Sequence, residues 1–191
     1  MKILGISGSP TKNGNNEKAI NDFLEIFSKK KFEVEKIFLS QYKINPCLSC
    51  GVCDKQKKCF QQDEMTKLLP LLENADAIIV SSPTYFGGVS GQLKSFFDRT
   101  ILLRRNGFLL KNKIGGAIAI GHARNGGQEY TIQNIHTWMH IHGMIVVGDN
   151  NHFGGILKTP IKKDKEGLKS VKDLANKICE TLKKFNPPLV P

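Results

Sequence analysis

Short apolar runs alternate along this chain with segments in which apolar residues recur every three or four positions. The runs lie at residues 2–6, 32–39, 75–80, 114–120 and 144–147, and the helical spacing at 19–27, 65–72, 93–101, 132–142 and 166–185. Apart from Asp76, the runs at 75–80 and 114–120 contain no polar residue, which is typical of strands covered on both faces of a parallel sheet. Five such strands joined by helices predict an α/β fold with a doubly wound, five-stranded parallel sheet, in a single domain spanning 1–191. Asp63 is expected to open the helix at 65–72, and Pro70 to kink or restart it.

The length of the apolar runs limits where the protein can reside. The N-terminal run at 2–6 is too short for the apolar region of a signal peptide, and none of the runs exceeds eight residues, which is too short for a transmembrane helix. We therefore expect a cytoplasmic protein with no membrane association.

Positive charge exceeds negative charge, with 28 Lys and Arg against 17 Asp and Glu, for a net charge of +11. Only four of the cations are Arg, and the Lys residues are scattered. A nucleic-acid surface would more often combine Arg with aromatic residues along one stretch, so we expect no nucleic-acid partner. The excess indicates a solvated surface, or one that attracts an acidic protein partner.

Four of the five cysteines, Cys47, Cys50, Cys53 and Cys59, lie within thirteen residues. Bacterial ferredoxins use the spacing C-x2-C-x2-C for three ligands of an iron-sulfur cluster, whereas zinc sites usually pair two separate C-x2-C units. We therefore predict a [4Fe-4S] cluster in an insertion at about 44–60, before the third strand. Zinc, or thiols without metal, are the alternatives.

Polar, glycine-rich loops follow four of the predicted elements, at 7–16, 81–88, 121–129 and 148–155. Ligands of doubly wound sheets bind at the carboxyl ends of the strands. The loop at 7–16 enters a helix, where backbone amides, hydroxyls and side-chain amides could surround the phosphate of a mononucleotide. A polar turn with a helix cap is the structural alternative.

Three groups of residues carry a family resemblance. They are Gly8-Ser9-Pro10 with Gly14-Asn15, then Ser82-Pro83-Thr84-Tyr85 followed by Leu93-Lys94-x-Phe96-x-Asp98-Arg99, and finally Gly126-Gly127-Gln128-Glu129. Over about residues 1–155 the chain resembles the flavodoxin-like NAD(P)H-dependent FMN reductase superfamily. With the cysteine motif it is similar to the iron-sulfur flavoprotein branch. The resemblance implies a flavodoxin-like sheet, bound FMN and a homodimer or homotetramer, in which a cluster can serve the flavin of another subunit.

The resemblance also assigns residues to the flavin. It places Ser9, Thr11, Asn13, Asn15 and Asn16 at the FMN phosphate, and Pro83, Thr84, Tyr85, Phe86, Gly87, Gly121, His122, Gly126 and Gly127 around the isoalloxazine ring. Many relatives have Arg at the position of Thr11 and Thr at that of Asn16. Lys12 can replace the missing charge.

These features predict an electron-transfer protein without a catalytic acid–base pair. Electrons would pass between a low-potential donor such as ferredoxin and an acceptor, through the cluster and FMN. One alternative is an NAD(P)H-dependent FMN or quinone reductase whose cysteines hold zinc or no metal, and another is a basic metal-binding adaptor. His136 and His140 have the spacing of metal ligands, but packing beside Trp138 explains them as well.

Overall fold

The strands form one parallel sheet in the order β2-β1-β3-β4-β5, with β6 also paired to β4. The structure is a computed structural model that describes residues 1–185, and the predicted proline-rich tail at 187–191 lies outside them. The strands are β1 Lys2–Ser7, β2 Glu33–Phe38, β3 Ala77–Pro83, β4 Ile114–Gly121, β5 Ile145–Val146 and β6 Gly155–Lys158. The predicted doubly wound parallel sheet is confirmed.

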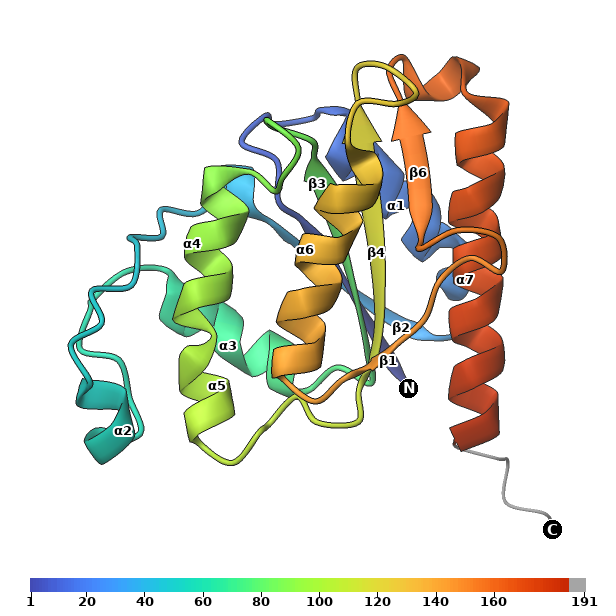
Figure 1. Cartoon of the computed structure of the whole chain (residues 1–191). Helices are drawn as coiled ribbons and strands as arrows, with labels where there is room; N and C mark the ends of the chain where they lie inside the picture. Colours follow the sequence, from blue (N-terminus) through green and yellow to red (C-terminus); the bar gives the residue numbers. More distant parts are fainter. Residues whose placement is uncertain (186–191) are drawn as a thin grey trace, which may run out of the picture.

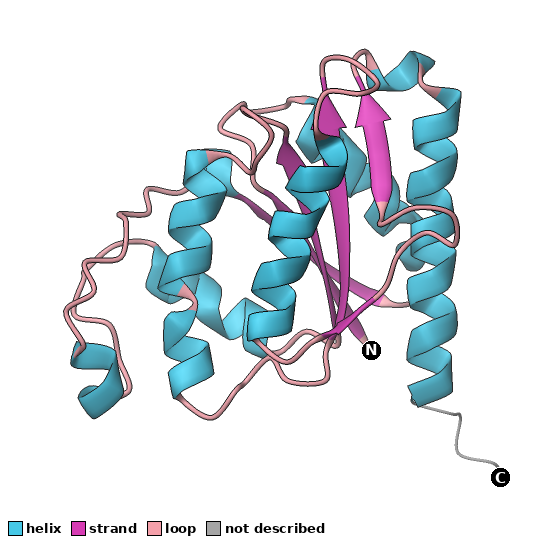
Figure 2. Cartoon of the chain, viewed as in Figure 1, coloured by secondary structure: helices cyan, strands magenta, loops and turns pink. Residues whose placement is uncertain are grey.

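Helices cover both faces of this sheet (Figures 1 and 2). They are α1 Asn15–Lys29, α2 Val52–Gln56, α3 Met65–Glu73, α4 Gly91–Arg99, α5 Ile101–Arg105, α6 Gln128–Ile141 and α7 Lys165–Phe185, with 3-10 turns η1 Leu39–Gln41 and η2 Ile161–Lys163. One apolar core lies between the sheet and α3, α4, α5 and α6, and a second lies between the sheet and α1 and α7. Every residue of β3 and β4 is buried, as their apolar sequences predict for strands covered on both faces.

The fifth position of the sheet is occupied by two short strands, where we predict one strand at 144–147. β5 pairs with Ile114 and Gly115 at the start of β4, and β6 pairs with residues 118–121 at its end. Because β3 lies along the other side of β4, β5 and β6 share one edge of it. The predicted fifth strand is therefore present as β5, though shorter than 144–147. The sixth strand, β6, was not predicted, and residue 155 begins this strand instead of ending a ligand loop.

Pro70 lies inside α3, which runs from Met65 to Glu73 without a restart. Of the two alternatives expected at Pro70, a kink or a restart, the restart does not occur. Asp63 does mark the start of this helix, because its Oδ1 accepts a hydrogen bond from the Met65 amide at 3.2 Å.

Four of the five cysteines, Cys47, Cys50, Cys53 and Cys59, lie in the segment between η1 and α3, called here the cysteine segment. α2 is the one helix in this segment among the described residues. In Figure 1 this segment lies to the left of α4 and α5, and α2 contacts α5. No helix within 1–185 combines the length and apolar character needed to cross a membrane.

Candidate functional site

Three of the predicted loops meet at the carboxyl edge of the sheet, at the top of Figure 1. They follow β1, β3 and β4, whose register places Ser7 beside Ser81 and Pro83 beside Ile120. The Gly8 amide also donates to the Ser81 carbonyl at 2.7 Å. The parallel sheet therefore brings loops that are far apart in sequence to one edge, as predicted.

The loop after β1 is organised by its own polar groups. The Ser9 hydroxyl, which is buried, accepts a hydrogen bond from the Thr11 amide at 3.1 Å. Asn13 has a left-handed backbone with φ of 54°, and its amide donates to Glu17 at 2.8 Å. The buried Glu17 carboxylate also accepts from Ser40 at 2.5 Å. The sequence analysis did not identify Glu17 as part of this loop.

The predicted phosphate-binding residues differ in their accessibility. Thr11 and Asn13 are exposed and Asn15 is half-buried. Asn16 is buried, and its Oδ1 accepts from Ser81 at 2.6 Å, so this oxygen joins α1 to β3. The Ser7 hydroxyl is buried without a hydrogen-bond partner. An unpartnered hydroxyl at the end of β1 is consistent with a ligand site.

The loop after β3 forms a tight two-residue turn. Tyr85 and Gly88 exchange two backbone hydrogen bonds of 3.0 Å, and Phe86 and Gly87 between them have φ of 48° and 76°. Phe86 is fully exposed and Tyr85 half-exposed, while Pro83 before them is buried. The turn thus presents two aromatic rings at the edge of the sheet.

The loop after β4 packs against this turn. Gly127 has φ of 94°, and a Cβ there would lie 3.2 Å from the Gly87 Cα. Thr131 ties the two loops together, because its hydroxyl lies 3.1 Å from the Thr84 hydroxyl and 3.2 Å from the Gly127 carbonyl. Thr131 was missed by sequence reasoning, although its position one turn into α6 offered a signal.

The rest of this loop is fixed from within the fold. The buried Gln128 side chain accepts from the Gly126 amide at 2.8 Å and donates to the Ala123 carbonyl at 2.6 Å, and it lies directly against Gly121. Arg124 pairs with the buried Asp164. His122 is exposed, with its Nδ1 3.4 Å from the Thr159 hydroxyl.

Helix α4 is joined to the first loop at its N-terminus. Ser90 is fully buried and caps α4 by accepting from the Leu93 amide at 3.1 Å, while its hydroxyl donates to the Gly8 carbonyl. Its amide donates to the Ser82 hydroxyl at 3.2 Å. A serine three residues before a helical apolar pattern was the available signal.

The four clustered cysteines line one cavity together with Arg99 and Arg105. All four are free thiols; Cys47 and Cys50 are exposed, and Cys53 and Cys59 are half-buried. Within 1–185, no three Cys, His, Asp or Glu side chains are close enough to ligate one metal ion. The structure therefore gathers the four thiols around one space without placing them in ligand geometry.

An ion pair anchors the cysteine segment at its base. The Arg99 guanidinium binds both Asp63 carboxylate oxygens, at 2.6 and 3.0 Å, and both side chains are almost fully buried. Burial alone would raise the pKa of Asp63, but hydrogen bonds from Arg99 and from the Asn45 and Met65 amides lower it below its ordinary value.

Comparison with known proteins identifies the family. Residues 1–155 match the NADPH-dependent FMN reductase family. An iron-sulfur flavoprotein of Methanosarcina thermophila is 50% identical over 182 residues, which cover 95% of each chain. Another, from Methanocaldococcus jannaschii, is 45% identical over 96% of this chain and 98% of its own. This chain belongs to the iron-sulfur flavoprotein family.

Solved structures confirm the flavodoxin-like fold of this iron-sulfur flavoprotein family member. An archaeal flavodoxin has a TM-score of 0.63 at 21% identity, covering 96% of this chain and 99% of its own. An NADH:FMN oxidoreductase has a TM-score of 0.70 at 17% identity, covering 94% and 89%. At these identities the likeness concerns the fold alone.

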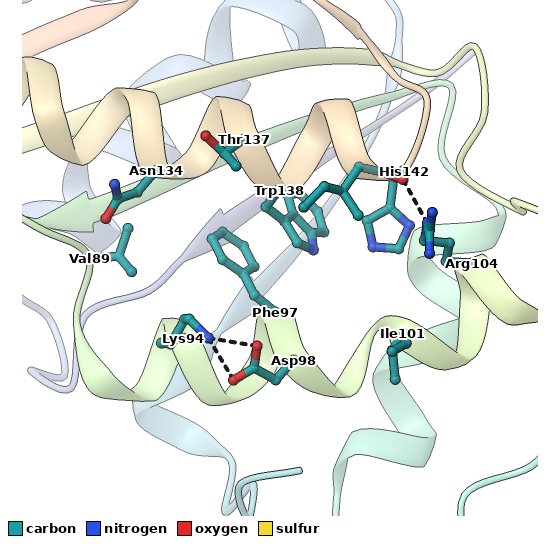
Figure 3. Close-up of a pocket in the computed structure, with 11 residues that line it drawn as sticks. Val89, Lys94, Phe97, Asp98, Ile101, Arg104, Asn134, Thr137, Trp138 and His142 are labelled. Atoms are coloured by element: carbon teal, nitrogen blue, oxygen red, sulfur yellow. Dashed lines mark hydrogen bonds and ion pairs between the residues drawn. The ribbon is translucent and has the colours of Figure 1, made fainter. Parts of the chain in front are cut away.

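A hollow of about 450 Å³ lies between α4–α5 and α6 (Figure 3). Its floor is Phe97 stacked on Trp138, with ring centroids 4.4 Å apart. The Thr100 hydroxyl donates to the Phe97 carbonyl at 2.6 Å and accepts from Trp138 at 2.8 Å, so the contact of 2.9 Å with His142 requires a proton on His142 Nε2.

The buried His142 is neutral at pH 7, because its pKa is low. Its Nδ1 has no partner, and burial together with the charge of Arg104 lowers its pKa to about 4. His136 has an unpartnered Nε2, and burial followed by the effect of His140 lowers its pKa to about 4 as well. The His142 ring packs edge-on against Trp138, with ring centroids 5.3 Å apart.

Proposed function

We propose that this protein transfers electrons between a low-potential donor such as ferredoxin and an acceptor, and that it holds a [4Fe-4S] cluster and FMN for this purpose. Membership of the family makes it a flavoprotein oxidoreductase. The observation that carries the proposal is the cavity in which four thiols face two guanidinium groups. FMN can exchange electrons singly or in pairs, and an iron-sulfur cluster passes them singly.

The cysteine cavity fits an iron-sulfur cluster by its chemistry. It supplies four free thiols, which we assign as the ligands: Cys47, Cys50, Cys53 and Cys59. Arg99 and Arg105 offset the negative charge of thiolates, and the apolar Leu48 and Phe60 also line the space. Closure of the segment around the cluster would bring the sulfurs into ligand positions.

The carboxyl edge fits FMN in the same way. Thr11, Asn13 and Asn15 offer exposed or half-exposed polar groups at the start of α1, next to the unpartnered Ser7 hydroxyl. Gly87, next to the exposed Phe86, lies close to Gly127, so a flat ring bound here would meet both an aromatic side chain and the backbone of two loops. These contacts bind and orient the flavin.

The two sites lie at opposite ends of α4–α5 within one chain. The flavin edge adjoins Ser90, whereas the cysteine segment adjoins Arg99 and Arg105. At the rise of a helix, Ser90 lies about 14 Å from Arg99 and about 22 Å from Arg105. Electron transfer slows steeply with distance, which favours a homodimer or homotetramer in which cysteines of one subunit approach the flavin of another.

A single substitution tests the cysteine assignment. Cys50→Ser should abolish iron binding and leave FMN bound, because the cysteine segment and the flavin loops are separate parts of the chain. Iron, sulfide and flavin are measured per chain after anaerobic purification, together with the visible spectrum. Cys179→Ala is the matched control, since Cys179 is buried on α7 and lies outside the cysteine cavity. Wild-type protein with flavin but no iron would reject the cluster.

The second candidate function is an NAD(P)H-dependent FMN or quinone reductase, which the match to NADPH-dependent FMN reductases favours. The choice of electron donor separates the two. Lys55, Lys57 and Lys58 are all exposed in the cysteine segment, so reduction by ferredoxin should be faster than by NADPH and should slow as salt rises. Stopped-flow reduction with each donor across a salt series measures this. Rapid reduction by NADPH with a slow, salt-insensitive ferredoxin reaction would favour the reductase.

A further inference from the structure

Two arginines face the cysteine segment: Arg99, the last residue of α4, and Arg105, the last residue of α5. Arg99 Nη2 lies 3.5 Å from the Cys59 sulfur, and Arg105 Nη1 lies 3.0 Å from the Cys53 sulfur. Each guanidinium also binds a carboxylate that belongs to the cysteine segment or its base. The two arginines therefore hold both the thiols and the backbone that carries them.

Arg99 closes the base of the segment. Besides its two bonds to Asp63, it donates to the Asn45 carbonyl at 2.9 Å, and the Asn45 amide donates to Asp63 at 2.9 Å. Residues 45 and 63 are thus bonded to each other and to one guanidinium. Since all four clustered cysteines lie between them, this pair defines where the segment leaves and rejoins the fold.

Arg105 holds the outer part of the segment. Its Nε binds the Asp54 carboxylate at 2.7 Å while its Nη1 reaches Cys53, and the adjacent Asn106 donates to the Lys57 carbonyl at 3.0 Å. Arg105 and Asn106 therefore make three bonds to α2 and to Lys57, the residue that directly follows it. A planar guanidinium can bind a carboxylate and a sulfur at once, which a lysine ammonium does less well.

We propose that Arg99 and Arg105 are positioning residues for an iron-sulfur cluster, which seat Cys59 and Cys53 and raise the reduction potential of the bound cluster. Hydrogen bonds to ligand sulfurs stabilise the more negative, reduced form of a cluster and so raise its potential. This inference rests on the proposed function, because it assumes that the cysteines ligate the cluster.

Arg105→Gln tests the effect on potential, since Arg105 is partly exposed and its loss should not unfold the chain. Arg104→Gln removes the same charge from the neighbouring position, where the side chain instead contacts the Ile141 carbonyl and the Phe108 ring. We expect Arg105→Gln to lower the cluster potential in a redox titration followed by EPR, with the flavin potential unchanged. Arg104→Gln should leave both close to wild type. Equal cluster potentials in all three proteins at equal iron content would overturn the proposal.

The anchoring role of Arg99 is tested without any cluster. The double variant Arg99→Gln with Asp63→Asn removes both buried charges together, which avoids leaving one of them unpaired. In iron-free protein, amide hydrogen exchange in residues 43–62 should accelerate at least about tenfold relative to wild type, with exchange in β4 unchanged. Unchanged exchange in 43–62 would overturn the anchoring role. If wild-type protein takes up no iron, the proposed function is rejected. The exchange result still decides the anchoring role, because it is measured in iron-free protein.

Discussion

Replacement of Ser90 by alanine tests how the phosphate loop is held on the fold. Ser90 is fully buried, and its hydroxyl is the side-chain cap of α4 and a donor to the Gly8 carbonyl. Alanine removes one oxygen atom and almost no volume. The change therefore isolates two hydrogen bonds, one from Ser90 to the Gly8 carbonyl in the loop after β1 and one from the Leu93 amide within α4.

The structure sets the expected loss of stability. Removal of a serine cap costs about 1 kcal/mol, within a range of roughly 0.5–2 kcal/mol. A buried carbonyl left without a partner costs about 1–3 kcal/mol. We therefore expect Ser90→Ala to lower the free energy of unfolding of the FMN-free protein by about 2–4 kcal/mol. FMN affinity should fall as well, because the loop loses its attachment.

Urea unfolding of both proteins measures the loss, with the slope m expected to stay unchanged. Ser95→Ala is the matched control: Ser95 is half-buried on the same helix and has no side-chain hydrogen bond in the described structure, so its substitution should be neutral or stabilise by about 0.5 kcal/mol. A loss below about 1 kcal/mol for Ser90→Ala would refute the reasoning. An equal loss for Ser95→Ala would show that α4 is sensitive to any change.

Three further predictions follow from other sites. The unfolded chain binds a proton at His142 near pH 6.5 and the folded chain near pH 4, so the free energy of unfolding falls as the pH drops through this window. In urea unfolding, wild type should lose about 2 kcal/mol more between pH 7 and 5 than His142→Gln, which keeps the similar contribution of His136. Ser9→Asp should weaken FMN far more than riboflavin in fluorescence titrations, because it places a carboxylate beside the phosphate, and equal losses would remove Ser9 from that site. Gly127→Ala should destabilise by about 1–2 kcal/mol, since φ is 94° and the Gly87 Cα is close, whereas Gly91→Ala, with open space around it, should not.

The central strands were predictable because a strand buried on both faces is almost entirely apolar in sequence. The apolar stretches at 75–80 and 114–120 gave the positions of β3 and β4 to within three residues at each end. The edge of the sheet was harder, because β5 has only two residues and β6 has four. Gly148 and Gly154 flank the connection between them and resemble a ligand loop, so Ile156 and Leu157 were not distinguished as a strand.

The loops of the candidate site were predictable for a related reason, since they follow the strands at one edge. The residues that join those loops were not. Ser90 bonds to Gly8 across 82 positions and Thr131 to Thr84 across 47. A hydroxyl gives no indication in sequence of which distant carbonyl it will reach. Glu17 was missed because a carboxylate near a predicted anion site looks unfavourable until its bonds to Asn13 and Ser40 are seen.

Helix α4 joins the two candidate sites physically. Ser90 at its start bonds to the loop after β1, and Arg99 at its end bonds to the base of the cysteine segment, about 14 Å away at the rise of a helix. Between them, Leu93 and Phe96 are completely buried against the sheet, so the helix cannot shift without loss of core packing. A substitution in this buried face should therefore disturb flavin and iron binding together. The ion pair of Lys94 with Asp98 lies on the exposed face, and its removal should disturb neither.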